Sequence, residues 1–289
     1  MKAEQFDTCL LCGSHKLRTL IGYETNFLVQ CNNCHFVFCQ RKPTSLELTE
    51  HYLKYTRANF ISPITINRYE ELLEGFEKFR KSNNIIDVGC GDGYFLEAAK
   101  KRNWNVYGTE FTEEAIALCK QKGIDMQKGS LNTNHYTEVF FDVITSFEVI
   151  EHINNPLPEV KAFHNILRVG GLVYVTTPNF NSISRNFLGS SWNIIEYPEH
   201  LSYYTKKTLT NLFRSFKFQL LDISTTGISI NRIKRSNSSS ASSSAVNHDE
   251  AIREKAEKQM LFRWIKIGIN LMLNLFSKGD AIKASFIKL

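Results

Sequence analysis

Three alternating glycines form the first candidate binding segment. Gly89, Gly91 and Gly93 directly follow the apolar run at 85–88. Glycines spaced in this way let the backbone turn sharply and approach a ligand closely, because a Cβ there would collide with the ligand or forbid the backbone angles. A dinucleotide-binding loop would need Gly or Ala at position 94, where this chain has Tyr94. The spacing therefore indicates a nucleotide-type cradle and disfavours NAD and FAD.

An acidic residue ends the next predicted strand. Glu110 closes the strand at 105–110 and lies 21 positions after Gly89. A doubly wound fold places there the carboxylate that accepts hydrogen bonds from ribose hydroxyls. A glycine loop alone is a weak signal, and a generic turn with a surface Glu is the alternative. The loop, the strand-end acid and a further strand in order make the binding interpretation stronger.

Four cysteines near the start of the chain have metal-ligand spacing. Cys9 and Cys12 form one C-x-x-C pair, Cys31 and Cys34 form a second, and 18 residues separate the pairs. Four thiolates at this spacing are typical of a tetrahedral zinc site in a ribbon. The site is closed, because no position is left for water, so its role should be structural. Cys39 lies outside the spacing and is expected to pack in the interior.

Alternating strand and helix patterns surround the glycine loop. Such alternation predicts a parallel sheet with helices on both faces and ligands at the carboxyl ends of the strands. A helix is expected before the first strand, where apolar residues recur at helical spacing over 66–79. The other predicted elements are strands at 85–88, 105–110, 125–129, 141–147, 172–177, 218–224 and 281–289, and helices at 94–103, 113–121 and 156–168.

The glycine loop and the strand-end acid resemble two motifs of a known family. The segment 87–93, Asp-Val-Gly-Cys-Gly-Asp-Gly, resembles the first motif of the class I S-adenosylmethionine (SAM)-dependent methyltransferases, and Glu110 resembles the second. The resemblance implies an α/β fold with a Rossmann-like seven-stranded methyltransferase sheet. This chain adds a small N-terminal zinc ribbon and a C-terminal amphipathic helix insertion. We expect the zinc ribbon at 1–45, a helical bridge or cap at 46–80, and the methyltransferase domain at 81–289.

The same resemblance implies a set of SAM-binding residues. The glycines would face the methionine end of SAM, and Glu110 would hold the ribose. Many relatives carry Asp after the third strand, where this chain has Ser130, so an adenine contact there would use backbone groups or the hydroxyl. The implied residues are Asp87, Gly89, Cys90, Gly91, Gly93, Glu110, Phe111, Ser130, Leu131 and Phe147.

The segment 141–152 resembles the fourth-strand motif of these methyltransferases. By that resemblance Phe147 and Glu148 are delivered toward the sulfonium and the acceptor, with Glu151 and His152 on the following turn. An imidazole with a pKa near 6.5 suits proton abstraction, so His152 is a candidate general base. The alternative is that His152 only holds the loop.

A second histidine lies in an insertion rich in aromatic residues. Pro198 to Thr205, which includes His200, resembles a phrase in methyltransferases encoded near bacterial surface-polysaccharide genes, many of which also carry the cysteine pairs. The insertion suggests an acceptor lid at the carboxyl edge of the sheet. We expect His200 to be the base in preference to His152, because a lid residue would approach the acceptor opposite the methyl donor. The alternative is that His200 packs the loop. The predicted catalytic residues are His200, His152 and Glu148.

The end of the chain combines a serine-rich stretch with an apolar helix. Seven serines fall within 236–244, so 235–248 is expected to be disordered. The helix predicted over 250–277 has a wide apolar face with basic residues and Trp264. That composition fits a peripheral membrane contact, a dimer contact or packing on its own domain, and leaves the oligomeric state open.

Composition limits the classes of partner. The formal net charge is +6, which is modest for a nucleic-acid-binding protein of 289 residues, so no specific nucleic acid is expected. No signal peptide or spanning apolar run is recognised, which predicts a cytoplasmic protein or one peripheral to the inner face of the membrane. The leading hypothesis is methyl transfer from SAM to a small-molecule, sugar-like or lipid-linked acceptor in surface-glycan synthesis. The alternatives are an RNA methyltransferase with a zinc ribbon, a quinone-type O-methyltransferase and a non-catalytic SAM-binding scaffold.

Overall fold

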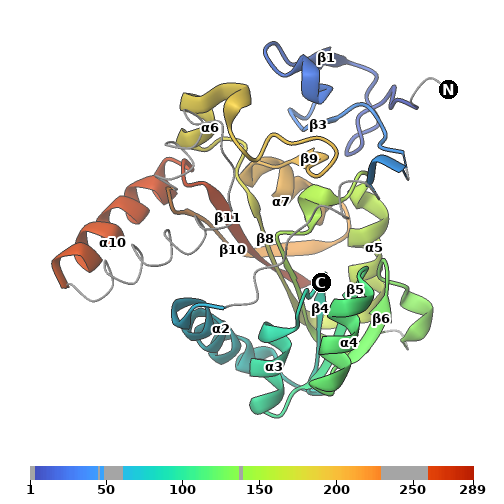
Figure 1. Cartoon of the computed structure of the whole chain (residues 1–289), viewed down its shortest axis with the longest axis vertical. Helices are drawn as coiled ribbons and strands as arrows, with labels where there is room; N and C mark the ends of the chain where they lie inside the picture. Colours follow the sequence, from blue (N-terminus) through green and yellow to red (C-terminus); the bar gives the residue numbers. More distant parts are fainter. Residues whose placement is uncertain (1–3, 45, 49–60, 137–138, 229–259) are drawn as a thin grey trace.

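Two sheets organise the chain. The structure, a computed structural model, describes residues 4–44, 46–48, 61–136, 139–228 and 260–289. A large seven-stranded sheet runs through the middle of the molecule, and a small four-stranded sheet lies above it at the N-terminal end (Figure 1). This architecture confirms the predicted α/β fold with an added N-terminal ribbon. The predicted stretch 235–248 and the first part of the helix at 250–277 lie outside the described residues.

The large sheet is mixed, and its strand order reverses at one strand. The order is β10-β11-β8-β7-β4-β5-β6, in which β11 is antiparallel to both neighbours. The chain runs from β4 outward to β6 and then returns to β7 on the other side of β4. A crevice forms at such a reversal, beyond the carboxyl end of the strand. The strands are β4 (Asn84–Val88), β5 (Asn105–Glu110), β6 (Asp125–Lys128), β7 (Phe141–Phe147), β8 (Leu167–Pro178), β10 (Phe218–Thr226) and β11 (Ala281–Lys288).

Successive strand residues pack on opposite faces of the large sheet. Ile85 belongs to an apolar cluster with residues of α2, α3 and α4, whereas Ile86 belongs to a second cluster with residues of α5 and α7. Alternation of this kind follows from the pleat of a strand. Because both faces of the sheet are covered, successive residues of these strands are apolar. The helices are α2 (Pro63–Phe76), α3 (Tyr94–Lys101), α4 (Glu113–Gln121), α5 (Pro156–Ile166), α6 (Ile183–Leu188) and α7 (Lys206–Arg214), with short 3₁₀ turns at Glu24–Asn26, Glu77–Phe79, Thr133–His135, Ile150–His152 and Gly189–Ser191.

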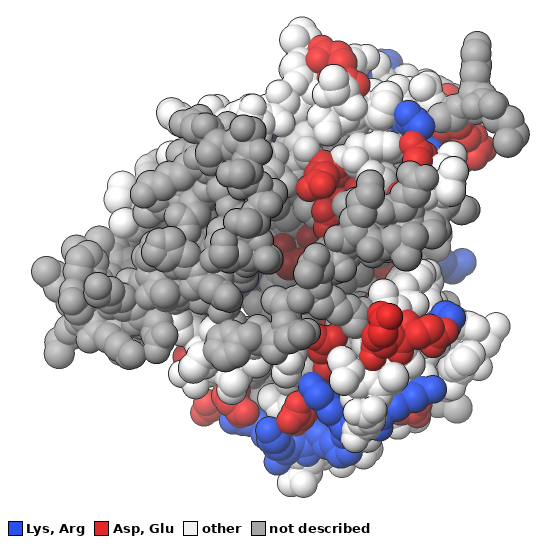
Figure 2. Space-filling view, viewed as in Figure 1, with Lys and Arg blue, Asp and Glu red and all other residues white. Residues whose placement is uncertain are grey.

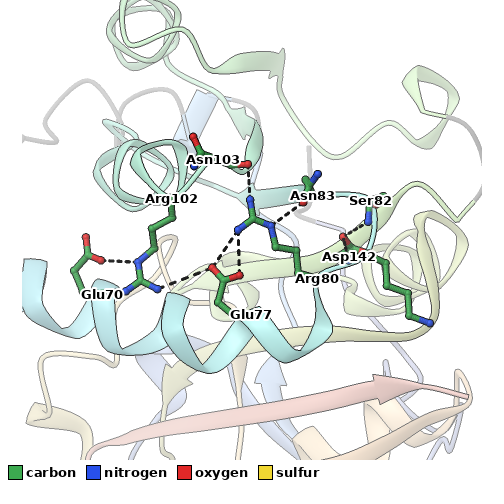
Figure 3. Close-up of polar contacts among 9 residues, drawn as sticks. Glu70, Glu77, Arg80, Ser82, Asn83, Arg102, Asn103 and Asp142 are labelled. Atoms are coloured by element: carbon green, nitrogen blue, oxygen red, sulfur yellow. Dashed lines mark hydrogen bonds and ion pairs between the residues drawn. The ribbon is translucent and has the colours of Figure 1, made fainter.

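Polar contacts tie α2 to the sheet. Arg80 bonds Glu77 and the carbonyl of Asn103, and Arg102 pairs with Glu70 of α2 at 2.8 Å (Figure 3). Nearby, the buried Asp142 accepts hydrogen bonds from the Ser82 backbone at 2.7 Å and from other groups of the same region. These contacts hold α2 against the C-terminal end of α3, on the same face of the sheet.

The boundary between one predicted helix and the strand after it differs from the structure by several residues. The helix predicted over 156–168 ends at Ile166, and β8 begins at Leu167 rather than at 172. Leu167 pairs with Phe141 of β7, and Arg168 donates to Asp142 at 2.5 Å. These long-range contacts extend the strand backward across Gly170 and Gly171, which lie between the helix and the strand predicted from the sequence.

The small sheet combines strands from distant parts of the chain. Its order is β1-β2-β3-β9, all antiparallel, with β1 (Leu17–Thr19), β2 (Leu28–Cys31), β3 (Val37–Cys39) and β9 (Ser202–Tyr203). β9 comes from the insertion after β8, so the ribbon and the insertion share one sheet (Figure 1). Neither β3 nor β9 was predicted from the sequence.

Helix α10 (Met260–Leu275) presents polar residues to its own protein. Asn274 accepts a hydrogen bond from the backbone of Thr225, and Asn270 accepts one from Gly227. Leu271 and Leu275, in contrast, are 66% and 78% exposed. No helix within the described ranges is both long and apolar enough to cross a membrane.

Candidate active site

A cavity of about 310 Å³ lies at the carboxyl end of β4, where the strand order reverses. Its size is at the lower end of the range for small-molecule sites. Five predicted SAM residues line it: Asp87, Gly89, Cys90, Gly91 and Phe147. Thr65 and Tyr69 of α2 also line it, although nothing in the sequence distinguished them from core residues. The remaining lining residues are Ile61, Asp92, Tyr94 and Phe95.

The three glycines have different structural roles. All have positive φ, which L-residues rarely adopt. A Cβ at Gly89 would lie 2.6 Å from Val149, and one at Gly93 would lie 2.7 Å from the sulfur of Cys119. A Cβ at Gly91 would meet nothing within 4 Å. Gly89 and Gly93 therefore allow close packing, and Gly91 keeps open the space in which a ligand would lie.

Asp87 is buried beneath the glycine loop. The residue is 3% exposed, and its carboxylate accepts a hydrogen bond from the Thr145 hydroxyl at 2.8 Å. Burial raises the pKa of Asp87 to about 7, although the Thr145 bond favours the charged form. Asp87 therefore joins β4 to β7 directly beneath the cavity.

Glu110 extends toward the glycine loop, as the sequence predicts. One carboxylate oxygen accepts a hydrogen bond from the Gly91 amide at 3.1 Å, and the other accepts one from the Phe111 amide at 2.8 Å. The carboxylate thus lies at the rim of the cradle, where ribose hydroxyls could replace the Gly91 amide. The residues present fit SAM: an open glycine position, a rim carboxylate and a cavity at the strand ends.

The other predicted SAM residues lie further from the cavity lining. Phe111 is 66% exposed and its ring lies 4.0 Å from the Cβ position of Gly129. Ser130 is exposed, and its carbonyl accepts a hydrogen bond from Gln127. Leu131 is buried in the core cluster. Their contact with the adenine end of SAM stays a prediction.

The four cysteines converge as predicted. Their sulfur atoms all lie within 4.8 Å of one another, with Cys9 and Cys34 separated by 3.4 Å and Cys12 and Cys31 by 3.6 Å. Zn–S bonds of about 2.3 Å in a tetrahedron place sulfur atoms about 3.8 Å apart. The hydrogen bond with Cys34 lowers the pKa of Cys9 to about 5, so one thiol of that pair is readily ionised. The cluster therefore fits a structural zinc ion.

The ribbon and the insertion share an apolar cluster. Leu28 and Val37 of the ribbon pack with Trp192 and Tyr203 of the insertion, and all four are buried. Leu201 adds backbone bonds on both sides: its carbonyl accepts from the Cys39 amide, and its amide donates to the Glu151 carbonyl, each at 2.8 Å. The ribbon thus holds the segment on which His200 lies.

The two candidate bases lie side by side. The rings of His152 and His200 are 4.7 Å apart between centroids, although the sequence suggested that they approach from different sides. Glu148 is exposed and has a φ of +54°, a conformation that is uncommon for a residue with a side chain. Its backbone turns the chain at the end of β7, so that Glu151, three positions later, points inward. The catalytic roles of His200, His152 and Glu148 stay predictions.

Glu151 joins the histidine pair, although the sequence gave it no catalytic role. One ligand atom from each of Glu151, His152 and His200 lies within 4.8 Å of the others. Glu151 is 2% exposed and accepts a hydrogen bond from Thr177 of β8 at 2.9 Å. Burial raises its pKa well above the ordinary value, and the charge of Glu148 raises it further. A carboxylate directly before His152 was visible in the sequence, but its burial depends on β8 and the insertion.

Comparison with known proteins gives a family. The methyltransferase domain family matches residues 56–223. The ubiquinone biosynthesis O-methyltransferase of Pseudomonas aeruginosa is 27% identical over 128 residues, which are 42% of this chain and 53% of that protein. The Aeromonas salmonicida enzyme of the same name is 28% identical over 104 residues, covering 34% of this chain and 44% of that enzyme. The chain thus spans about half the length of the curated relatives it matches.

Solved structures share the fold. A SAM-dependent methyltransferase from Archaeoglobus fulgidus has a TM-score of 0.53 and 16% identity, and the match covers 85% of this chain and all of that one (100%). The PH0226 protein of Pyrococcus horikoshii also has a TM-score of 0.53, at 13% identity, covering 83% and 99%. The match over more than half of the chain, with the cradle at the reversal of the sheet, shows that this protein belongs to the methyltransferase domain family.

Proposed function

We propose that this enzyme transfers the methyl group of SAM to an oxygen of a small-molecule, sugar-like or lipid-linked acceptor in surface-glycan synthesis. The observation that carries the proposal is the position of the polar cluster relative to the cavity. Phe147 lines the cavity, and Glu151 and His152 follow on the next turn beside His200. An acceptor bound at this edge would have one oxygen near the SAM methyl group and near groups that can accept the proton of that oxygen.

The residues that would hold SAM belong to the cavity and its rim. SAM supplies an activated methyl group on a sulfonium. Gly91 would leave room for the methionine part, and Glu110 would accept hydrogen bonds from the ribose. Tyr69 and Phe95, whose rings are 5.3 Å apart, would exclude water from above. Transfer then requires the acceptor oxygen to be held in line with the methyl carbon, after its proton has left.

Charge on the visible surface supports a small acceptor rather than RNA. Lys and Arg gather over α3 and α4 at the lower end of the molecule, but acidic side chains are interspersed among them (Figure 2). Glu97 pairs with both Lys101 and Lys122, at 3.3 and 3.1 Å. A continuous basic stripe would be needed to follow a phosphate backbone. The O-methyltransferase names of the relatives support an oxygen acceptor.

The exposed apolar side of α10 supports an acceptor at a membrane surface. Leu271, Met272 and Leu275 are each more than 60% exposed, while Asn270 and Asn274 face the protein. We propose that this side meets lipid, because an amphipathic helix binds an interface through its apolar side. Flotation with anionic vesicles should recover the wild type and lose Leu271→Gln/Leu275→Gln. Equal flotation of both proteins, or a concentration-dependent dimer that the variant abolishes, would contradict a membrane contact.

The acceptor class can be tested with labelled SAM. Purified protein would be incubated with methyl-labelled SAM and, separately, nucleotide sugars, lipid-linked sugars, quinols and RNA. We expect label in a sugar or lipid-linked fraction, and its loss in Gly91→Val and Glu110→Ala, which should also weaken SAM binding in calorimetry. Transfer to RNA alone would overturn the proposal, and transfer to quinols alone would reassign the acceptor.

A further inference from the structure

The cluster of Glu151, His152 and His200 has the composition of a metal centre. Two imidazoles and one carboxylate are the three protein ligands of many catalytic zinc and iron sites, which keep one or more positions open. In this protein one ligand atom from each of the three side chains lies within 4.8 Å of the others. Two atoms bonded to one ion at about 2.1 Å are at most about 4.2 Å apart, so little movement is needed.

Both rings are oriented as metal ligands usually are. Nδ1 of His152 lies 2.9 Å from the Glu199 carbonyl oxygen, and Nδ1 of His200 lies 2.6 Å from that of Ile194. A carbonyl can only accept, so Nδ1 carries a proton in each ring, and in the neutral ring Nε2 carries the lone pair. Histidines that bind metals commonly make this second hydrogen bond, which fixes both the tautomer and the direction of the ring.

The third ligand is fixed from a different strand. Glu151 is 2% exposed, and one of its oxygens accepts a hydrogen bond from the Thr177 hydroxyl at 2.9 Å. A buried carboxylate is stabilised by a cation or by several donors. The charges of Glu148 and Glu199 also act on Glu151, and acidic side chains gather just below the ribbon on the face drawn in Figure 2. The surroundings therefore favour a cation.

We propose that Glu151, His152 and His200 bind a divalent transition-metal ion, through the carboxylate and the two Nε2 atoms. The site is separate from the four-cysteine cluster, and it stands on the geometry of these three residues alone. Its role toward the acceptor rests on the proposed function. An acceptor hydroxyl bound at the open position would lose its proton to water more easily, and the resulting oxygen anion would attack the SAM methyl carbon as the S–CH₃ bond breaks.

Metal counting on the full chain tests the site. Metal-stripped protein would be titrated with Co²⁺ and Zn²⁺, and bound metal would be measured by mass spectrometry. We expect two ions per chain in the wild type. One Co²⁺ ion should show thiolate-to-metal absorption, and the other should not. His152→Ala should lose only the ion without that absorption, Cys34→Ser should lose only the thiolate ion, and the exposed His135→Ala should keep both.

A conservative variant keeps the test valid if an alanine variant does not fold. Glu151→Gln retains the side-chain shape and an acceptor for Thr177 but removes the charge, so metal affinity at the second site should fall at least about 10-fold. SAM affinity, measured by calorimetry in the same samples, reports separately on the cofactor site. One thiolate-bound ion per chain in the wild type, or two ions in both His152→Ala and Glu151→Gln with unchanged affinity, would overturn the metal site. Such a result would leave the methyltransferase function standing.

Discussion

Leu28→Ala should loosen the insertion that carries His200 without changing the SAM site. Leu28 is fully buried in β2 of the ribbon, in the cluster that contains Trp192 and Tyr203. Truncating a buried Leu to Ala costs about 2–5 kcal/mol, because the side chain's transfer energy is lost and a cavity remains. The ribbon supports the insertion directly, because β9 pairs with β3 and Leu201 bonds Cys39. The substitution should therefore reduce the stability of the ribbon and of the insertion together.

Hydrogen exchange measures this local loss directly. If the ribbon and the insertion open as one unit, a cost of 2 kcal/mol raises the exchange rate of their protected amides about 30-fold. The rise should appear in peptides covering 28–39 and 192–204, and it should be absent from β4 and β5. SAM affinity by calorimetry should change less than about twofold, because Tyr69, Phe95 and Phe147 of the cavity belong to a different apolar cluster from Leu28.

A matched substitution supplies the control. Leu96→Ala removes the same atoms from a side chain that is equally buried, but in the cluster beneath the glycine loop. It should raise exchange in β4 and β5, weaken SAM binding and spare 192–204. Two results would refute the reasoning: faster exchange in 28–39 with no change in 192–204, or a uniform rise over the whole chain in Leu28→Ala.

Three further predictions concern the ribbon, the sheet and the glycine loop. Removing metal with a chelator, or Cys34→Ser, should make the insertion sensitive to limited proteolysis while SAM still binds in calorimetry. Asp142→Asn should cost about 3–5 kcal/mol at pH 7, because Arg168 loses its buried partner. Burial opposes ionisation of Asp142, but hydrogen bonds from Arg168 and two amides outweigh it and hold its pKa below the ordinary value, so its contribution is present above about pH 4 and lost in acid. Denaturant unfolding should therefore show a difference in stability between the wild type and Asp142→Asn that is smaller at pH 3 than at pH 7. Gly93→Ala should lower the melting temperature more than Gly91→Ala, because only the former brings a Cβ to 2.7 Å from Cys119, whereas Gly91→Ala should mainly weaken SAM binding.

The cofactor side of the site could be predicted because its residues are close together in the sequence. Asp87 and Glu110 lie on two adjacent parallel strands, β4 and β5, and the glycines directly follow the apolar run of β4. Parallel strands bring their carboxyl ends to one edge, so order in the sequence translates into proximity. The same reasoning holds for the cysteines, whose four sulfur atoms lie within 4.8 Å of one another. Local spacing was sufficient in both cases.

The acceptor side could not be predicted in the same way. β9 has only two residues, so it has no period to recognise, yet its pairing with β3 positions His200. Glu151 becomes buried only because Thr177 and the insertion cover it. For α10, the pattern of apolar residues was recognised, but the polar side faces the protein because Asn270 and Asn274 bond the end of β10 and the residue after it. Each of these features depends on contacts between residues distant in sequence.

The residues matched by the family do not include all the strands that complete the two sheets. The family match covers 56–223 and so omits the ribbon strands β1 to β3 as well as α10 and β11. β11 nevertheless lies between β8 and β10 in the large sheet, and β3 pairs with β9 inside the matched region. A fragment limited to the matched residues would leave β8 without β11, one of its two neighbours, and Leu201 without the Cys39 amide. Methyl transfer should therefore require residues outside the matched region, because they hold the acceptor side of a site whose cofactor side lies within it.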